Sequence, residues 1–433
     1  MGSSNFFDFW KKLCPFIVTA KPMTDLCWTC QLNNTLIFRS ANLDEENKCE
    51  RVKQQENHLF IVQQERSLYN KMVGNAKRAC QENVITELCQ NSPCSRNIMM
   101  HYSFDYAQQV HLPSNPLQPG PIYFLVPRKY GLFGVCCEGI PRQVNFLVDE
   151  AHLISKGSNA VISYLHYFLN NYGTGETDAH FHCDNCSGQK KNRFVLWYFA
   201  WRVAVGLHKS VSLNFLIAGH TKFAPDWCFG LLKRAFKRNL VPAQSVLETV
   251  VNESSSVNIA QVVGYEDGTT VVPVSDWQAF FKNSCKPLPG IKKYQHFRFD
   301  DAHPGSVFVK EHSESAETEF NILMSDSSFP RGAPDVLAPP GLPLQRQQYL
   351  YKSIRKYVDE PFKDTVCPNP DVMPNVEQDE TVIITETRKD SDGHERVKRG
   401  RGKGSQRGQT GGGRRGCGRG HSRGRGQGEN NGV

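Results

Sequence analysis

The stretch at residues 179–192, AHFHCDNCSGQKKN, indicates a strand, a turn and then the start of a helix. It opens with alternating apolar residues, turns at Ser187-Gly188 and leads into an apolar helical pattern over residues 194–205. Asp184 therefore falls at the carboxyl end of a strand, where open α/β sheets gather ligands and metals. We predict that Asp184 belongs to a trio of metal-binding carboxylates.

A second aspartate lies inside the strand pattern at residues 98–107, where Asp105 interrupts apolar residues. Burying such a charge is costly unless it is paired or holds a metal. The third, Asp226, follows Pro225 at the predicted start of a helix, where Pro and acidic residues are favoured. For each aspartate, the alternative is an ordinary role at a strand end or in a helix cap.

The patterns between these landmarks predict strands and helices in an α/β order. Apolar runs bounded by turn residues indicate strands, and spacing of three to four residues indicates helices. The predicted strands are 98–107, 122–126, 132–138, 143–148, the opening stretch and 211–218, and the predicted helices are 43–83, 157–172, 194–205 and 225–237.

Four motifs in this order carry a resemblance to a known family: SFDYAQQ, NFLVDEA, HCDNCSGQKKN and AGHTKFAPDWCFGLLK. They resemble a transposon-derived, RNase H-like family of the DDE/DDD transposase and integrase type, over roughly residues 1–360. The resemblance implies a core with a mixed five-stranded sheet flanked by helices. It also implies that Asp105, Asp184-Asn185, Gly219-His220-Thr221 and Asp226 mark the site. Lys190 departs from the family pattern, in which Asn tends to stand first.

Such a trio would bind two Mg²⁺ or Mn²⁺ ions, which prefer hard oxygen ligands. Two ions can activate a water or 3′-hydroxyl and stabilise the oxygen that leaves a phosphodiester. Glu150 is a reserve ligand, and His220 could relay a proton. Asn185, Gln189 and Asn192 are predicted to hydrogen-bond to the metal-binding side chains or to the backbone around them.

Basic residues near the trio are candidates for phosphate contacts, although a solvated basic face would look the same. Trp227 could stack on a base, but core packing is the expectation. The candidate basic residues are Lys190, Lys191, Arg193, Lys233 and Arg234.

The amino-terminal segment contains a Cys27-x-x-Cys30 knuckle, which is half of a structural zinc site. We expect His58 and one further cysteine to complete it, with Cys14, Cys49, Cys80, Cys89 and Cys94 as candidates. A redox pair and inert thiols are the alternatives. Alternation places His182 and Asp184 on one face and Cys183 on the other, which argues against zinc there.

Charge is concentrated at the carboxyl end of the chain. Residues 396–433 hold eleven Lys and Arg and one Glu, a net charge of +10. Since the whole chain has a formal charge of +8, residues 1–395 carry about −2. This Arg/Gly tail, including Arg399, Arg401, Arg414 and Arg415, is predicted to be disordered from about residue 378 and to bind RNA or DNA. Residues 396–401 could also act as a nuclear localisation signal.

The predicted organisation has four parts: 1–95 (knuckle and long helix), 96–300 (RNase H-like domain), 301–377 (connector with a basic helix) and 378–433 (tail). With 15 Cys, no secretory signal and no membrane span, we expect an intracellular, reducing, nuclear location. A homodimer through residues 43–83 is one option.

The leading hypothesis is a metal-dependent nuclease or transposase acting on DNA, a polynucleotidyl transferase. The rivals are a catalytically silent nucleic-acid-binding protein of the same fold and a zinc-dependent adaptor.

Overall fold

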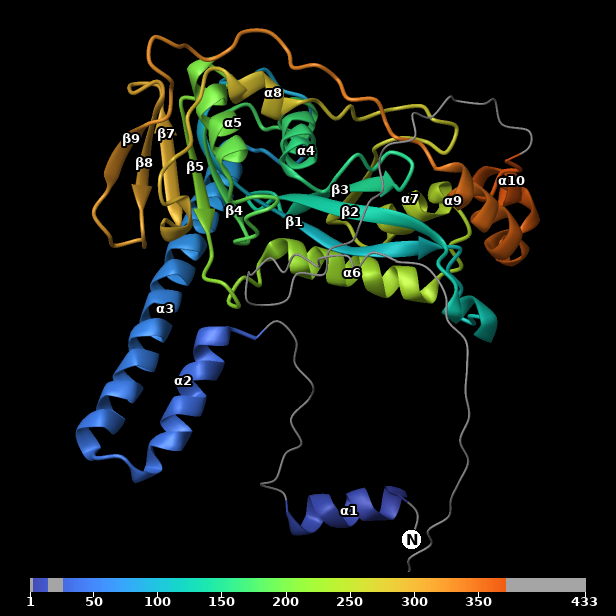
Figure 1. Cartoon of the computed structure of the whole chain (residues 1–433), viewed down its shortest axis with the longest axis horizontal. Coiled ribbons are helices and arrows are strands. Elements are labelled where there is room, and N and C mark those ends of the chain that lie inside the picture. Colours follow the sequence, from blue (N-terminus) through green and yellow to red (C-terminus); the bar gives the residue numbers. More distant parts are fainter. Residues whose placement is uncertain (1–2, 15–25, 371–433) are drawn as a thin grey trace, which may run out of the picture. The chain divides into compact units, whose positions relative to one another are not determined.

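The computed structural model describes residues 3–14 and 26–370, where the chain has a mixed α/β fold. The strands of these ranges form one nine-stranded mixed sheet in the spatial order β6-β3-β2-β1-β4-β5-β7-β8-β9 (Figure 1). Their bounds are β1 (Arg96–Leu112), β2 (Arg128–Cys137), β3 (Arg142–Asp149), β4 (Glu176–Cys183), β5 (Ser210–Phe215), β6 (Asn258–Val262), β7 (His296–Asp300), β8 (Ser306–Lys310) and β9 (Thr318–Asn321).

Strand β1 lies at the centre of the sheet. It pairs antiparallel with β2 and parallel with β4, which in turn pairs parallel with β5. Beyond this core, β3 is antiparallel to β2, and β7, β8 and β9 continue antiparallel past β5. The carboxyl ends of β1, β4 and β5 therefore point the same way, which places the residues that follow β4 and β5 near the second half of β1.

The longer helices of the described ranges are α1 (Ser3–Leu13), α2 (Trp28–Phe38), α3 (Glu45–Glu82), α4 (Ser158–Asn171), α5 (Arg193–Ala204), α6 (Ala224–Arg238) and α7 (Gln244–Glu253), and the shorter ones are α8 (Trp277–Lys282), α9 (Leu344–Tyr349) and α10 (Lys363–Val366). Helices α4, α5 and α8 lie on one face of this sheet, and α6 lies on the other (Figure 1).

One face of the sheet is apolar and is covered by α4, α5 and α8. Phe168 of α4 packs on Tyr102, and Phe199 of α5 packs on Phe181 with ring centroids 4.6 Å apart. Cys183 is fully buried in the same cluster, so the predicted strand alternation around Asp184 is confirmed. Burial of these aromatic side chains is a large source of folding free energy.

The opposite face is polar where α3 covers it and apolar where α6 and α7 cover it. Tyr69 of α3 packs edge-on against His101 and His182, which are buried on neighbouring strands and hydrogen-bond to each other at 2.8 Å. Because side chains alternate along a strand, Asp105 and Asp184 lie on this same face. The polar residues of this face thus lie next to a second hydrophobic cluster, which includes Leu132 and Leu147 of the sheet and Leu232 of α6.

The helix predicted over residues 43–83 is present as α3, which is continuous from Glu45 to Glu82. Asp44 caps it by accepting a hydrogen bond from the N–H of Asn47 at 2.9 Å. The segment 262–274 contains a tight turn, since the N–H of Tyr265 donates to Thr269 O and Gly268 has φ +92°.

Two expectations about the sheet were wrong. Residues 122–126 are not a strand, because Gly120–Phe124 forms a 3₁₀ turn that leaves Tyr123 77% and Phe124 83% exposed. Pro119 and Pro121 on either side of Gly120 lack the N–H groups that a strand ladder needs. The sheet also runs past the boundary predicted at residue 300, because β8 and β9 extend it.

No helix in the described ranges is both long enough and apolar enough to cross a bilayer. The predictions for the Arg/Gly tail, including Arg399, Arg401, Arg414 and Arg415, lie outside the described residues.

Candidate functional site: an acidic pair and a four-ligand centre

Asp105 and Asp184 are brought together by a single lysine. The ammonium of Lys190 donates to Asp105 Oδ1 and lies 2.8 Å from Asp184 Oδ1. Two hydrogen bonds end to end limit the separation of these carboxylate oxygens to about 6 Å. Asp105 reaches this place from the middle of β1, whereas Asp184 directly follows β4.

Burial and charge oppose each other in this pair. Burial raises the pKa of Asp105 above its ordinary value, and the charge of Asp184 adds to that rise, while Lys190 lowers it. Burial alone would lower the pKa of Lys190, but the charges of Asp105 and Asp184 outweigh it and raise that pKa. The lysine is therefore a fixed cation between two carboxylates.

Lys190 and Lys191 were expected beside a phosphate track, but the structure turns both inward. The backbone N–H groups of both residues donate to Cys186 O, so the chain turns back on itself after β4. Lys190 is fully buried and Lys191 is 4% exposed, with its ammonium bonded to Asn185 Oδ1 and Gln295 Oε1. Burial lowers the pKa of Lys191 to about 8. In this conformation neither lysine is available to a nucleic-acid backbone.

Asp226 begins α6, as predicted, but its carboxylate serves the helix itself. Asp226 Oδ2 accepts a hydrogen bond from the N–H of Phe223 at 3.1 Å, which is one half of a helix cap. Among the interactions of the described residues, none joins Asp226 to Asp105 or Asp184. Helix α6 nevertheless packs on the same sheet face as the pair, because a Cβ at Gly134, the β2 partner of Asp105, would lie 2.7 Å from Phe229.

A second constellation joins Cys27, Cys30, His58 and His220. Their ligand atoms all lie within 4.8 Å of one another, so this group could hold a metal ion. Cys27 Sγ is 3.3 Å from His58 Nε2, and Cys30 Sγ is 3.4 Å from His220 Nε2. Burial lowers the pKa values of His58 and His220, which favours the neutral imidazole that metals bind.

The prediction of Cys27, Cys30 and His58 in one metal-binding group agrees with this geometry, but the predicted fourth partner was wrong. Among the described residues no further cysteine joins the group: Cys49 and Cys89 are exposed, and Cys80 contacts Met100 in the core. The fourth position belongs to His220, which we had placed in catalysis. The signal for it was Gly219, whose φ of +77° and lack of a side chain let this loop approach Cys27.

The predicted supporting residues have different roles. Asn185 donates to Leu216 O and accepts from Lys191, so it links the turn after β4 to the loop after β5. Asn192 caps α5 by accepting from the N–H groups of Phe194 and Val195. Gln189 is half-buried in the turn, where its N–H donates to Cys186 O.

Glu150 is not a reserve ligand. Its carboxylate is held by Arg346 at 2.8 Å. Asp105 aligns across β2 with Asn145, and Glu150 lies five residues farther along, about 16 Å at strand spacing. The prediction failed because distance along β3 separates the two acids.

The remaining basic candidates are accessible. Arg193 and Arg234 are exposed and Lys233 is half-buried, the last two on α6. Trp227, expected in the core, is 57% exposed at the start of the same helix. Trp227 thus adds an exposed aromatic ring to the helix that carries Lys233 and Arg234.

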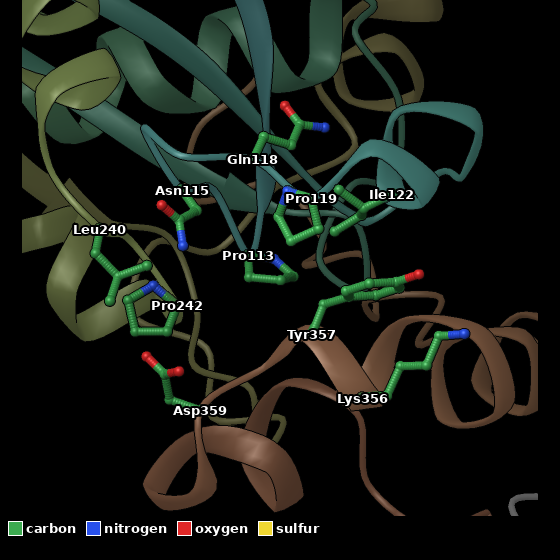
Figure 2. Close-up of a pocket in the computed structure, with 10 residues that line it drawn as sticks. All are labelled: Pro113, Asn115, Gln118, Pro119, Ile122, Leu240, Pro242, Lys356, Tyr357 and Asp359. Carbon is green, nitrogen blue, oxygen red and sulfur yellow. The ribbon is translucent and has the colours of Figure 1, made fainter.

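A pocket of about 240 Å³ lies beyond the carboxyl end of β1, where its lining begins at Pro113 (Figure 2). Figure 2 shows it between the segment after β1, the segment after α6 and the segment around Tyr357. Its lining consists of Pro113, Asn115, Gln118, Pro119, Ile122, Leu240, Pro242, Lys356, Tyr357 and Asp359. None of the predicted site residues lines it.

A family profile described as a domain of unknown function (DUF7869) matches residues 129–317. The matched segment runs from β2 to the residue before β9, so it includes Asp184, His220 and Asp226 but neither Asp105 nor Cys27. No curated protein matches the chain, and no solved structure matches it. The segment from β2 to β8 is thus similar to a domain of unknown function, whereas the central strand β1 lies outside the match.

Proposed function

We propose that this protein is a transposase-type enzyme with an RNase H-like core that cuts or joins nucleic-acid phosphodiesters. Asp105 and Asp184 would hold divalent ions of the Mg²⁺ or Mn²⁺ kind, with Asp226 as the third acid. The ions would supply activation of the attacking oxygen and stabilisation of the leaving oxygen.

The observation that carries this proposal is the meeting of Asp105 and Asp184 on one face of the sheet. The two residues are far apart in the sequence, and a pair of carboxylates this close is unfavourable without a cation. The arrangement of β1 to β5 supports it, because they lie side by side in a mixed sheet with helices on both faces. That is the arrangement expected of the RNase H-like core.

Lys190 occupies the position between the carboxylates that a bridging ion would need. Its single charge balances only one of them, whereas a divalent ion would balance both. Metal binding would therefore displace the ammonium from Asp105 and Asp184, and the freed lysine would lie next to the bound phosphate. The natural substrate by this reasoning is a polyanion, with DNA as the first candidate and RNA as the second.

The Asp184→Asn variant of the full chain is expected to lose metal-dependent nicking of supercoiled DNA. The amide keeps the shape of the side chain but removes the charge that holds a hard cation. Nicking with Mn²⁺ or Mg²⁺, followed on agarose gels, should fall to the level seen with chelator. Calorimetric titration should show weaker Mn²⁺ binding in the same variant.

Asp267→Asn is the matched control. Asp267 lies in the turn that follows β6, where it accepts from the N–H of Thr269, and it is not one of the proposed metal-binding acids. It should nick like the parent chain. Unchanged nicking by Asp184→Asn would end the catalytic assignment.

A second candidate is a catalytically silent nucleic-acid-binding protein with the same core. The salt bridge of Lys190 to both acids and the cap made by Asp226 favour it, since each acid already has a partner. Normal DNA binding without any heat of Mn²⁺ or Mg²⁺ binding would select this candidate. Exposed Arg193 and Arg234 would then supply the phosphate contacts, and a nuclear location would suit either candidate.

For the four-ligand centre we propose structural zinc. Two thiolates and two imidazoles form a tetrahedral zinc set, with Zn–S near 2.3 Å and Zn–N near 2.05 Å, so each S–N edge should be about 3.6 Å. The two S–N distances of 3.3 and 3.4 Å are close to that edge. The set uses all four positions and leaves none for substrate, which is typical of structural sites.

A further inference from the structure

Helix α2 lacks the hydrophobic anchoring that holds other helices in place. None of its eleven residues is buried, and Trp28 and Phe38 are 76% and 85% exposed. An isolated helix of this length is marginal in water, and burial is the usual source of its stability. Leu36 and Ile37 are only half-buried, so apolar packing alone holds α2 against α3 weakly.

The polar contacts of α2 converge on the metal-binding group. Asn33 donates to Gln55 Oε1 of α3 at 3.0 Å, and Gln55 in turn donates to Cys30 Sγ. Cys27 stands at the helix cap and Cys30 in its first turn, while His58 lies in α3. The ligands therefore attach α2 to α3 at its amino-terminal end.

The fourth ligand, His220, belongs to the loop between β5 and α6, and that loop is held against α3. Arg66 of α3 donates to His220 O at 2.7 Å. Leu216 and Phe223, on either side of His220, pack with Tyr69 and Val73 of α3 in one buried cluster. The same loop ends at the cap formed by Phe223 and Asp226.

Gly219 shows how closely this loop and α2 must approach. A Cβ at Gly219 would lie 2.3 Å from Cys27 Cα, which is a steric clash. Only a shift of the backbone could remove it. Its φ of +77° is also unfavourable for other residues. The glycine thus permits the approach that brings His220 to Cys30.

We propose that zinc at Cys27, Cys30, His58 and His220 is a clamp that orders α2 and fixes the loop from Leu216 to Phe223. Through this loop, zinc occupancy sets the position of Asp226 and the start of α6. The ordering of α2 and the loop stands by itself, whereas the effect on Asp226 in catalysis rests on the proposed function.

Hydrogen exchange of the full-length, reduced chain tests the clamp without nucleic acid. With one equivalent of zinc, the amides of α2 and those of His220 and Phe223 should be protected. After zinc is stripped with a chelator, protection of α2 and of the loop should be lost together, while α4 should be unchanged. Elemental analysis should find one zinc per chain.

Three variants sharpen this test. Cys30→Ser should lower zinc affinity by more than about 100-fold. That exceeds the loss expected when a residue that only hydrogen-bonds to a ligand is removed. Cys49→Ser, at an exposed cysteine outside the centre, should bind zinc normally. Gly219→Ala should lower the affinity by about 10-fold or more although it removes no ligand, because its Cβ forces the loop away from Cys27.

Two results would overturn the clamp: reduced protein that takes up no zinc, or α2 exchange that is identical with and without zinc. Failure of the catalytic proposal would look different. In that case zinc-dependent protection would persist while the chain failed to nick DNA, or while Asp184→Asn nicked like the parent.

Discussion

Arg128→Ala is expected to lower the free energy of unfolding by about 3–5 kcal/mol, the range for breaking a buried ion pair. Arg128 is 2% exposed and Asp149 is fully buried, and the pair is bidentate, with Nε–Oδ2 2.7 Å and Nη2–Oδ1 3.1 Å. The guanidinium also donates to Val366 O at 3.0 Å, which ties the segment around α10 to the sheet. Urea unfolding followed by circular dichroism measures the loss.

The size of this loss depends on the uncompensated charge that remains on Asp149. The double variant Arg128→Met, Asp149→Leu removes both charges and should recover most of the stability. Arg346→Ala offers a milder comparison, because Arg346 and Glu150 are 18% and 14% exposed and water can solvate the partner left behind. A free energy for Arg128→Ala within about 1 kcal/mol of the parent would contradict the buried pair.

Lys190→Met is expected to destabilise the metal-free chain at neutral pH by less than Arg128→Ala does, about 1–3 kcal/mol, because Asp105 and Asp184 are 19% and 33% exposed and water can partly solvate them. It leaves Asp105 and Asp184 facing each other with no cation between them. Added Mn²⁺ or Mg²⁺ should restore stability more strongly in the variant than in the parent, because the ion no longer competes with an ammonium. Thermal unfolding against ion concentration measures this difference.

The same variant should respond to pH in a defined direction. Burial already raises the pKa of Asp105, and loss of Lys190 removes the group that lowers it. A carboxyl with a raised pKa in the folded state favours folding when protonated, so stability should fall as pH rises above its ordinary value of 3.8. Lys191→Met is the control, since Lys191 bonds to two amide oxygens and no acid. The acidic site would be contradicted if the stability of Lys190→Met responded to divalent ions and to pH no more strongly than the stability of the parent chain.

Much of the secondary structure around the site was predictable because its signals are local. The turn at Ser187-Gly188, the Pro225-Asp226 helix start and the strand around Asp105 each depend on neighbours within a few residues. Strand alternation likewise separated Cys183 from Asp184, and the structure confirms it. The added strands β7 to β9 were harder to assign to the same sheet, because pairing with β5 depends on contacts between segments far apart in the chain.

The predictions that failed concern side chains whose partners come from elsewhere. Basic composition suggested that Lys190 faces a phosphate, but two half-buried carboxylates, Asp105 on β1 and Asp184 after β4, draw it inward. Glu150 ends a strand, as Asp184 does, yet Arg346 holds it. Charge and strand position alone do not distinguish these outcomes, since both depend on the nearest opposite charge in the folded chain.

The sequence by itself determined the type of each candidate group: hard oxygen ligands on the sheet, and thiolates at Cys-x-x-Cys spacing ahead of a helix. Only the tertiary structure decided which distant residues complete them. His220 reaches Cys30 across 190 positions because α3 packs along the polar face of the sheet and holds the β5–α6 loop against α2. Backbone geometry sets spacing within an element, whereas packing between elements sets which side chains meet.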